Sequence, residues 1–346
     1  MTELANTKPR IQQEELLTLT TQALQSYGLS HESARKTSEI LVLADMFGLH
    51  THGVSRVLSY GQRMDLGGIT VHAQPDIEVC GPAISKVNGA NAIGPLVGYV
   101  ALEQAMKQAR EAGVSAVFAR GSNHFGPVSP YSFLAAKQGF ASFICSNASI
   151  TIAPWGGKES RLGNSPMGFG VPNPEGDPFL LDMALSVAAR AKIRQALQQG
   201  TSIPETWATD REGKPTSDPK QALQGFLLAI GGHKGYGLAL AVDLFAGLLS
   251  DAAYLTHVKS WSENPEEPQN LGHFFLLIDT KRLGSMAWLG ERMQDFARIL
   301  HETPASDPRQ PVIVPGEIEL NRYRQACKDG VQVAADVMTH LKQRAA

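Results

Sequence analysis

Apolar residues recur every three or four positions near the start of the chain. The segment Ile11–Tyr27 has this spacing and stops before Gly28, which predicts a helix. A second helix is predicted to follow Ser30, whose side chain suits an N-terminal cap, and to end at Gly48. No period is sustained from there to about Ala90, so this stretch is predicted to be irregular.

The middle of the chain alternates between helical and strand-like patterns. Helical spacing covers Pro95–Ala112 and Pro130–Gln138, and each of these segments precedes a short apolar run, Val114–Ala119 and Phe140–Cys145 respectively. This order of elements favours an α/β fold in which the two strands pair in parallel through a right-handed crossover.

Further elements are predicted toward the C-terminus. Turn-forming residues within Val171–Leu180 predict a β-hairpin, and Gly235–Leu249 is so apolar that we expect a buried helix. The remaining predictions are helices at Ala188–Gln199, Met286–Leu300 and Asp329–Gln343, a strand at Phe274–Ile278, and loops at Lys214–Pro219 and Glu302–Arg309. We therefore expect a helical module of residues 9–75 with 316–344, and an α/β region of residues 76–315.

Composition and charge narrow the class of protein. With 346 residues, 43% of them hydrophobic, the chain can bury a sizeable core. The net charge is −2 and no basic stripe occurs, so neither nucleic acid nor a membrane surface is expected as a partner. The polar segment Met1–Gln13 contains no apolar signal core. Cys80, Cys145 and Cys327 are odd in number and widely spaced, which favours a reducing compartment such as the cytoplasm.

A histidine and an arginine stand four residues apart after the second predicted helix. His52, preceded by Thr51, can exchange a proton near neutral pH, and Arg56 can hold a carboxylate through two hydrogen bonds. The same spacing is compatible with a capping histidine and a surface arginine. The spacing by itself favours this second interpretation.

Three other polar loops could line a site. Gly121–Gly126, which contains His124, follows a predicted strand, where α/β sheets often bind ligands. Gly231–Gly237 opens the apolar helix with convergent backbone amides and Lys234, a pattern that suits a phosphate group. Leu162–Gly168 could line a pocket through Asn164, although a plain loop fits this segment better.

Several familiar sites are missing from the sequence. No G-x-G-x-x-G follows a strand, so a Rossmann dinucleotide site is not predicted. Neither HExxH nor paired cysteines accompany His50, His52 and His124, and we therefore expect no metal. A G-x-S-x-G elbow is also absent, which argues against an α/β-hydrolase.

Taken in order, these motifs resemble the malate/L-lactate dehydrogenase family of NAD(P)-dependent oxidoreductases. The resemblance covers nearly the whole chain and rests on the following residues: Thr51–Gly53 with Arg56, Asn88–Gly89, Ser122–Gly126, Gly163–Pro166, Asp182–Ala184, Ala189–Lys192, Gly232–Gly237 and Pro315–Glu317. It implies a non-Rossmann α/β fold, a cofactor that is either NAD or NADP, and a homodimer whose active site borders the interface.

The resemblance also implies roles for individual residues. His52 corresponds to the usual proton donor, assisted by Thr51, and His124 to a residue that takes this role in some relatives. Arg56 corresponds to the clamp for the substrate carboxylate. The further substrate-side residues are His124, Asn164 and Lys192, and the cofactor-side residues are His124, Gly126, Ser146, Asp182, His233, Lys234, Gly235, Pro315 and Glu317.

The predicted activity is hydride transfer between NAD(P) and a small 2-hydroxy or 2-keto acid. Lys192 favours acids such as malate or lactate. Within enzymes, the alternative is an NAD(P)H-dependent reductase of cyclic-imine carboxylates, which needs the same clamp. A nucleotide-binding protein without turnover is a more distant alternative, and a metal-dependent hydrolase is more distant still.

Overall fold

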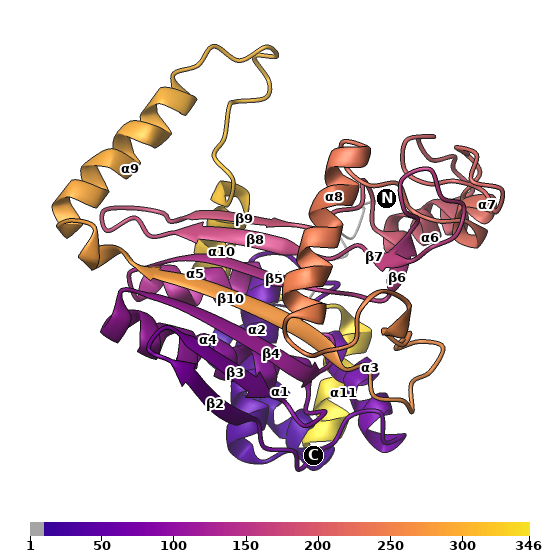
Figure 1. The fold of residues 1–346 in the computed structure, drawn as a ribbon, viewed down its shortest axis with the longest axis horizontal. Helices are drawn as coiled ribbons and strands as arrows, with labels where there is room; N and C mark the ends of the chain where they lie inside the picture. The colour runs from indigo at the N-terminus through magenta and orange to yellow at the C-terminus, as the bar shows by residue number, and fades with distance from the viewer. Residues whose placement is uncertain (1–9) are drawn as a thin grey trace, which may run out of the picture.

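The computed structural model describes residues 10–346, and its centre is a seven-stranded mixed sheet (Figure 1). The strands, in their order across the sheet, are β2 Asp76–Gly81, β3 Ile84–Asn88, β4 Val114–Ser122, β10 Leu271–Asp279, β5 Phe140–Ser146, β8 Met167–Val171 and β9 Phe179–Met183. Within this sheet β3 and β4 pair in parallel, and all other neighbours are antiparallel. Two short sheets pair β1 Arg10–Ile11 with β11 Val331–Gln332, and β6 Ile150–Ile152 with β7 Leu162–Gly163.

Helices cover both faces of the central sheet. Their bounds are α1 Gln13–Ser26, α2 His31–Met46, α3 Arg56–Asp65, α4 Gly94–Ala112, α5 Ser129–Lys137, α6 Arg190–Gln199, α7 Pro219–Gln224, α8 His233–Val242, α9 Met286–His301, α10 Glu317–Asp329 and α11 Ala335–Ala345. On one face α4 and α5 pack against the sheet and α2 packs behind them; on the other lie α8 and the π-helical turn Asp243–Leu248 (Figure 1). A separate apolar core fills each side.

Several predicted elements are confirmed. Ser30 caps α2, because its Oγ accepts a hydrogen bond from Ser33 N at 3.2 Å. The left-handed Gly113, with a φ of 86°, closes α4. The predicted hairpin is also present, since Val171 on β8 pairs with Phe179 on β9.

The predicted pairing of the two middle strands is wrong. Strands β4 and β5 are not neighbours, because β10 lies between them and runs antiparallel to both. They still point the same way. Strand β10 comes from more than a hundred residues further along the chain, so local patterns could not reveal its place.

Three further predictions are corrected by the structure. The stretch before Ala90 is not irregular, because it contains α3, β2 and β3. The helix predicted over Asp329–Gln343 is α11, which begins only after the strand β11. The segment Gly235–Leu249 is helical, but it changes from α- to π-helix at Asp243 and leaves Leu244 and Leu249 half exposed within this chain.

Both ends of the chain join one core. Helix α11 packs against α1, and α10 against α2. The same apolar core extends from these helices to strands β3, β4 and β5. The expected boundary at residue 9, and most of the polar segment Met1–Gln13, lie outside the described residues. The division into two modules therefore remains a prediction.

Candidate active site

A buried carboxylate shapes the loop that carries His52. Asp45, on α2, accepts a hydrogen bond from Val54 N at 2.7 Å and pairs with His50 Nδ1 at 2.9 Å. Gly53 is needed at this turn, because a Cβ atom there would collide with the Asp45 carboxylate. These contacts hold the loop tightly between α2 and α3.

The two candidate histidines lie side by side. The ring centroids of His52 and His124 are 5.5 Å apart. The Thr51 hydroxyl lies 2.8 Å from His52 Nδ1, and the Tyr60 hydroxyl lies 2.7 Å from His124 Nδ1. Each ring is thus held through Nδ1. A hydroxyl that donates to Nδ1 places the ring proton on Nε2, where it can meet a substrate oxygen.

Arg56 begins α3 beside this pair and is stacked on an aromatic ring. Its guanidinium carbon lies 4.8 Å from the ring centroid of Trp261, which itself stacks on His124 at 5.2 Å with an interplanar angle of 12°. The Nε atom of Arg56 is buried without a hydrogen-bond acceptor in residues 10–346. A guanidinium stacked on its flat face still presents its N–H groups in the ring plane, which suits a bound carboxylate.

Burial in the site disfavours the protonated form of both histidines. Burial lowers the pKa of His52 to about 4, and the charge of Arg56 adds to this. Burial, followed by Arg56, also lowers the pKa of His124 well below its usual range. The sequence alone suggests a titration near neutral pH, whereas the structure moves it into the acidic range. Neutral imidazoles can accept a proton from a hydroxyl group or donate a hydrogen bond to a carbonyl oxygen.

Sequence reasoning missed three members of this cluster: Tyr60, Arg63 and Trp261. The first two follow Arg56 by four and seven residues, so they share its face of α3. Helix α3 was not predicted from the sequence because it is short and polar and contains Gly61. In the structure this glycine packs closely against the ring of Tyr27. Had that helix been recognised, its spacing would have signalled Tyr60 and Arg63. No local pattern signalled Trp261.

A set of buried, hydrogen-bonded side chains anchors the loop that carries His124. His273 on β10 lies 2.7 Å from Ser122 Oγ through Nε2 and 2.8 Å from Ser146 Oγ through Nδ1. Its ring stacks on Phe125 with centroids 4.1 Å apart. Ser146, predicted on the cofactor side, is therefore joined to the loop that carries His124. Gly126 closes this loop in the left-handed conformation at a φ of 86°.

The predicted anion-binding loop has the expected local geometry. Gly231 and Gly232 both adopt positive φ, 56° and 64°, and Gly232 precedes the first turn of α8. His233 and Lys234 are exposed at this helix start, where backbone N–H groups lack intrahelical partners. Gly235 permits close packing, because a Cβ there would collide with the Ile230 carbonyl. The role of this loop in binding a cofactor phosphate remains a prediction.

Other predicted site residues make contacts that stabilise the fold. Asp182 accepts a hydrogen bond from Ser129 N at 2.8 Å at the start of α5, and Glu317 accepts one from Val314 N at 3.0 Å. The Pro315 and Asn164 carbonyls accept from Leu180 N and Leu185 N at 3.2 and 2.7 Å, and Lys192 is exposed on α6. In the described chain, no hydrogen bond or ring contact joins these residues to His52 or His124, so their roles remain predictions.

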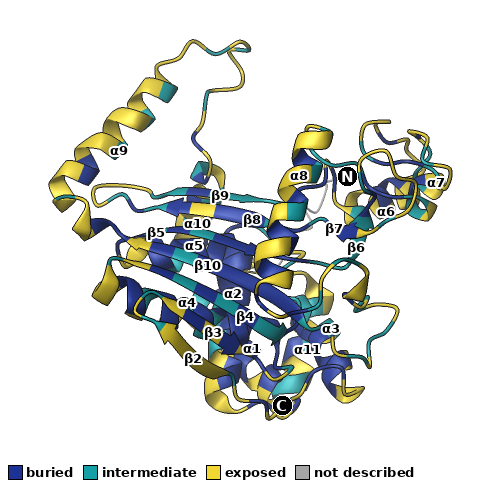
Figure 2. Cartoon of the chain, viewed as in Figure 1, coloured by how far each residue is buried: buried dark blue, intermediate teal, exposed yellow. Residues whose placement is uncertain are grey.

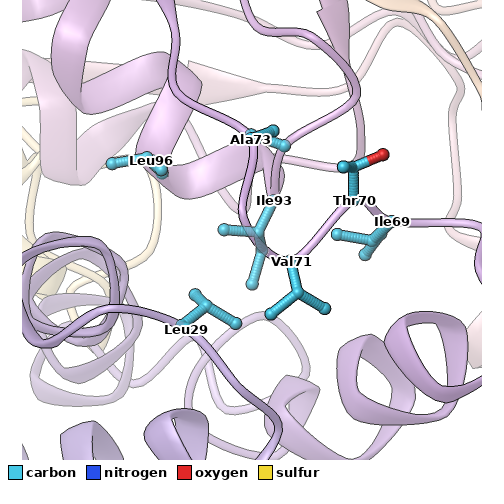
Figure 3. Close-up of a pocket in the computed structure, with 8 residues that line it drawn as sticks. Leu29, Ile69, Thr70, Val71, Ala73, Ile93 and Leu96 are labelled. Carbon is cyan, nitrogen blue, oxygen red and sulfur yellow. The ribbon is translucent and has the colours of Figure 1, made fainter.

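Two hollows lie away from the histidines. The apolar crevice between Leu29, Ile69, Val71 and Ile93 is packed too closely to hold a ligand (Figure 3). A cavity of about 340 Å³ lies between the end of α5 and the β8–β9 turn, and no predicted site residue lines it. Between residues 10 and 346, no three His, Cys, Asp or Glu side chains form a metal-binding group.

The clustered side chains match the needs of one kind of reaction. Arg56 carries a positive charge that suits a carboxylate, and beside it lie two imidazole rings, a group that suits proton exchange. The sheet order differs from that of a Rossmann fold, and the start of α8 has free backbone N–H groups of the kind that can bind a phosphate. Fold and site together define an oxidoreductase of small carboxylic acids.

Comparison with known proteins supports this class of enzyme. The profile of the malate/L-lactate dehydrogenase family matches residues 11–342, and the chain belongs to this family. The chain is 36% identical over 328 residues to L-sulfolactate dehydrogenase of Methanocaldococcus jannaschii, with 92% of each chain covered. Its fold is similar to malate dehydrogenase from Entamoeba histolytica, with a TM-score of 0.90, 27% identity and coverage of 98% and 97% of the two chains. It is also similar to delta1-piperideine-2-carboxylate reductase from Pseudomonas syringae, with a TM-score of 0.87, 27% identity and coverage of 97% and 99%.

The predicted fold and function are therefore confirmed. The chain is an NAD(P)-dependent oxidoreductase that transfers hydride to or from a small 2-hydroxy or 2-keto acid. NAD or NADP supplies the hydride chemistry when bound. No helix within residues 10–346 is long and apolar enough to span a membrane.

Proposed function

We propose that this enzyme interconverts malate- or lactate-like 2-hydroxy acids and their 2-keto acids, with Arg56 as the carboxylate clamp and His52 as the main proton donor. The observation that carries the proposal is the buried, unpartnered Nε of Arg56 beside a neutral imidazole pair. The side chains around this guanidinium, His52, Tyr60 and Trp261, carry no negative charge. A substrate carboxylate would supply the missing counter-charge. Lys192 could receive a second anionic group, as in malate.

The decisive experiment is a substrate panel. Oxidation of NADH and of NADPH is followed with purified enzyme against about ten 2-keto acids and several cyclic-imine carboxylates. We expect turnover of at least one small keto acid. Turnover of imines alone would favour the second candidate, an imine reductase, which the likeness to the piperideine-carboxylate reductase supports. Saturable NAD(P)H binding with no turnover would identify a non-catalytic nucleotide-binding protein.

Replacement of Arg56 by lysine should not preserve function. The lysine ammonium is a point charge and cannot reproduce the planar fork, nor the stacking on Trp261 that orients it. We expect kcat/KM for the keto acid to fall at least ~10-fold, about the 1.5 kcal/mol of one hydrogen bond to a charged group. Cofactor affinity, measured by fluorescence titration, should stay the same. Near-native kcat/KM would show that the clamp lies elsewhere.

Lys234→Ala tests the cofactor loop. Lys234 lies on the exposed first turn of α8, where it would add charge to the backbone donors that face a phosphate. NAD(P)H binding should weaken by about 1.5–3 kcal/mol, the range for a hydrogen bond to a charged group. Lys220→Ala, on the exposed surface of α7, is the matched control and should leave the dissociation constant unchanged. Equal affinities for all three proteins would remove Lys234 from the site.

A homodimer forms part of this proposal. Leu238, Leu244, Phe245, Leu248 and Leu249 are 43–51% exposed on α8 and its π-helical turn. Helix α9 projects from the body and is mostly exposed (Figures 1 and 2). Contiguous apolar surface of this kind marks interaction sites. Sedimentation at micromolar concentration should give a dimer, and Leu244→Glu should shift it toward monomer. An active wild-type monomer would refute the assembly.

The proposed compartment is the cytoplasm. The three cysteines of the chain are all unpaired, and two of them, Cys80 and Cys327, are exposed. Exposed free thiols are typical of proteins kept in a reducing environment.

A further inference from the structure

A loop from the far half of the chain forms one wall of the active site. The segment Lys259–Gln269 contains neither helix nor strand and lies beside α3, just before β10 (Figure 1). Its two ends are joined, because Gln269 Nε2 donates to the Lys259 carbonyl at 3.2 Å. Lys259 also forms an ion pair with Glu267 at 3.2 Å. These two contacts join the start of the loop to its end.

Arg63 fastens this loop to the catalytic cluster. Its guanidinium donates to the carbonyls of Pro265 and Glu267 at 3.2 and 2.8 Å, and to Gln269 Oε1 at 3.2 Å. The same Gln269 oxygen accepts from His124 N at 3.3 Å. One buried arginine thus binds the loop, and one glutamine side chain links it to the backbone of a candidate catalytic histidine.

The loop places Trp261 beside two of the side chains that are expected to bind the substrate. The indole stacks on His124, the proposed second donor beside His52, and lies against the guanidinium of Arg56, which would hold the carboxylate. Trp261 is partly buried against the core, so its ring has firm support. A keto acid held at these two points has one more substituent on its carbonyl carbon, the group at C3. Because Trp261 contacts both His124 and Arg56, we expect this C3 group to lie near its ring.

We infer that Trp261 is a specificity-determining residue, which limits the bulk of the C3 group that the site accepts. The inference rests on the proposed clamp and acts on the same site. The indole fills space that a larger substrate would need, and it keeps the edge of Arg56 free for the carboxylate by covering its face. We therefore expect the intact ring to admit small acids such as pyruvate or 2-oxobutyrate and to exclude phenylpyruvate.

The test compares substrates of different size in Trp261→Ala, Trp261→Phe and wild-type enzyme at saturating NAD(P)H. We expect the ratio of kcat/KM for phenylpyruvate to that for pyruvate to rise at least ~10-fold in Trp261→Ala, in keeping with what pocket size alone contributes to selectivity. Trp261→Phe should lie between Trp261→Ala and wild type. Trp207→Phe, at a half-buried indole packed against the apolar core on the other side of the sheet, is the matched control and should leave the ratio unchanged.

A binding measurement separates this inference from the proposed function. Calorimetric titration of lactate and of phenyllactate into the enzyme with bound NAD(P)H gives the same size ratio without turnover, because the hydroxy acid and the cofactor are both already reduced. If wild-type enzyme reduces no acid of the panel, the proposed function fails, and the ratio of dissociation constants decides the role of Trp261. An unchanged size ratio in Trp261→Ala, with native circular dichroism and NAD(P)H affinity, would overturn the inference.

Discussion

His52→Asn should lower kcat for keto-acid reduction by at least ~100-fold, while leaving NAD(P)H affinity unchanged. Hydride arrival places negative charge on the carbonyl oxygen, and a positioned proton donor lowers that barrier. His52 is held by Thr51 at 2.8 Å and stands four residues before the proposed clamp, Arg56. Single-turnover kinetics with saturating NAD(P)H would separate this chemical step from product release.

His124→Asn is the matched comparison for this experiment, since both rings are held by a hydroxyl at Nδ1. We expect a smaller loss for His124→Asn, because His124 would act as a second donor or an orienting group. If His124→Asn instead abolishes turnover and His52→Asn only weakens binding, the main proton donor is His124.

The pH dependence follows from the lowered pKa of His52, about 4 in the free enzyme. Reduction needs the protonated imidazole, whose fraction falls about tenfold per pH unit above the pKa. The kcat/KM for keto-acid reduction should therefore decrease as pH rises from 5 to 8. Oxidation of the hydroxy acid needs the neutral ring, so its dependence on this group should be flat above about pH 5–6 and fall below pH 4. A bound substrate carboxylate offsets the charge of Arg56. The pKa of His52 in the enzyme–substrate complex, which the pH profile of kcat reports, should therefore be higher than in the free enzyme. His52→Asn should remove this ionisation.

Arg63→Met should lower the free energy of unfolding by at least ~3 kcal/mol. Arg63 is 2% exposed, and its five hydrogen bonds end on neutral oxygens, those of Gly68, Asn123, Pro265, Glu267 and Gln269. Methionine keeps much of the apolar volume but leaves these acceptors without their donor. Each buried acceptor that stays unpaired costs roughly 1–3 kcal/mol, although water can reach some of them.

Urea unfolding followed by circular dichroism measures this change. The control is Arg324→Met, which removes an exposed arginine paired with Asp177 and should cost no more than about 1 kcal/mol. A cost for Arg63→Met as small as that of the control would show that the loop Lys259–Gln269 does not depend on Arg63. The identity of the fold would be unaffected by that result.

The sequence by itself determined the elements whose signals are local. Helix α2 could be located because Ser30 caps it, and α4 because Pro95 and Gly113 bound it. The motifs at His52, Arg56 and His124 were visible because chemically active side chains stand next to glycines and turns. The resemblance built on them correctly indicated the family, and with it the activity and cofactor type.

Only the tertiary structure determined which of these elements contact one another. Strand β10 separates β4 from β5, because a segment from late in the chain supplies their hydrogen-bonding partner. The same long-range connection brings His273 beneath the His124 loop and the Lys259–Gln269 loop over Arg56. The histidine pKa values also depend on this assembly, because burial and a neighbouring guanidinium exist only once the chain has folded. Spacing along a sequence reports neighbours on one helix or strand, but contacts between distant segments arise from the packing of the whole core.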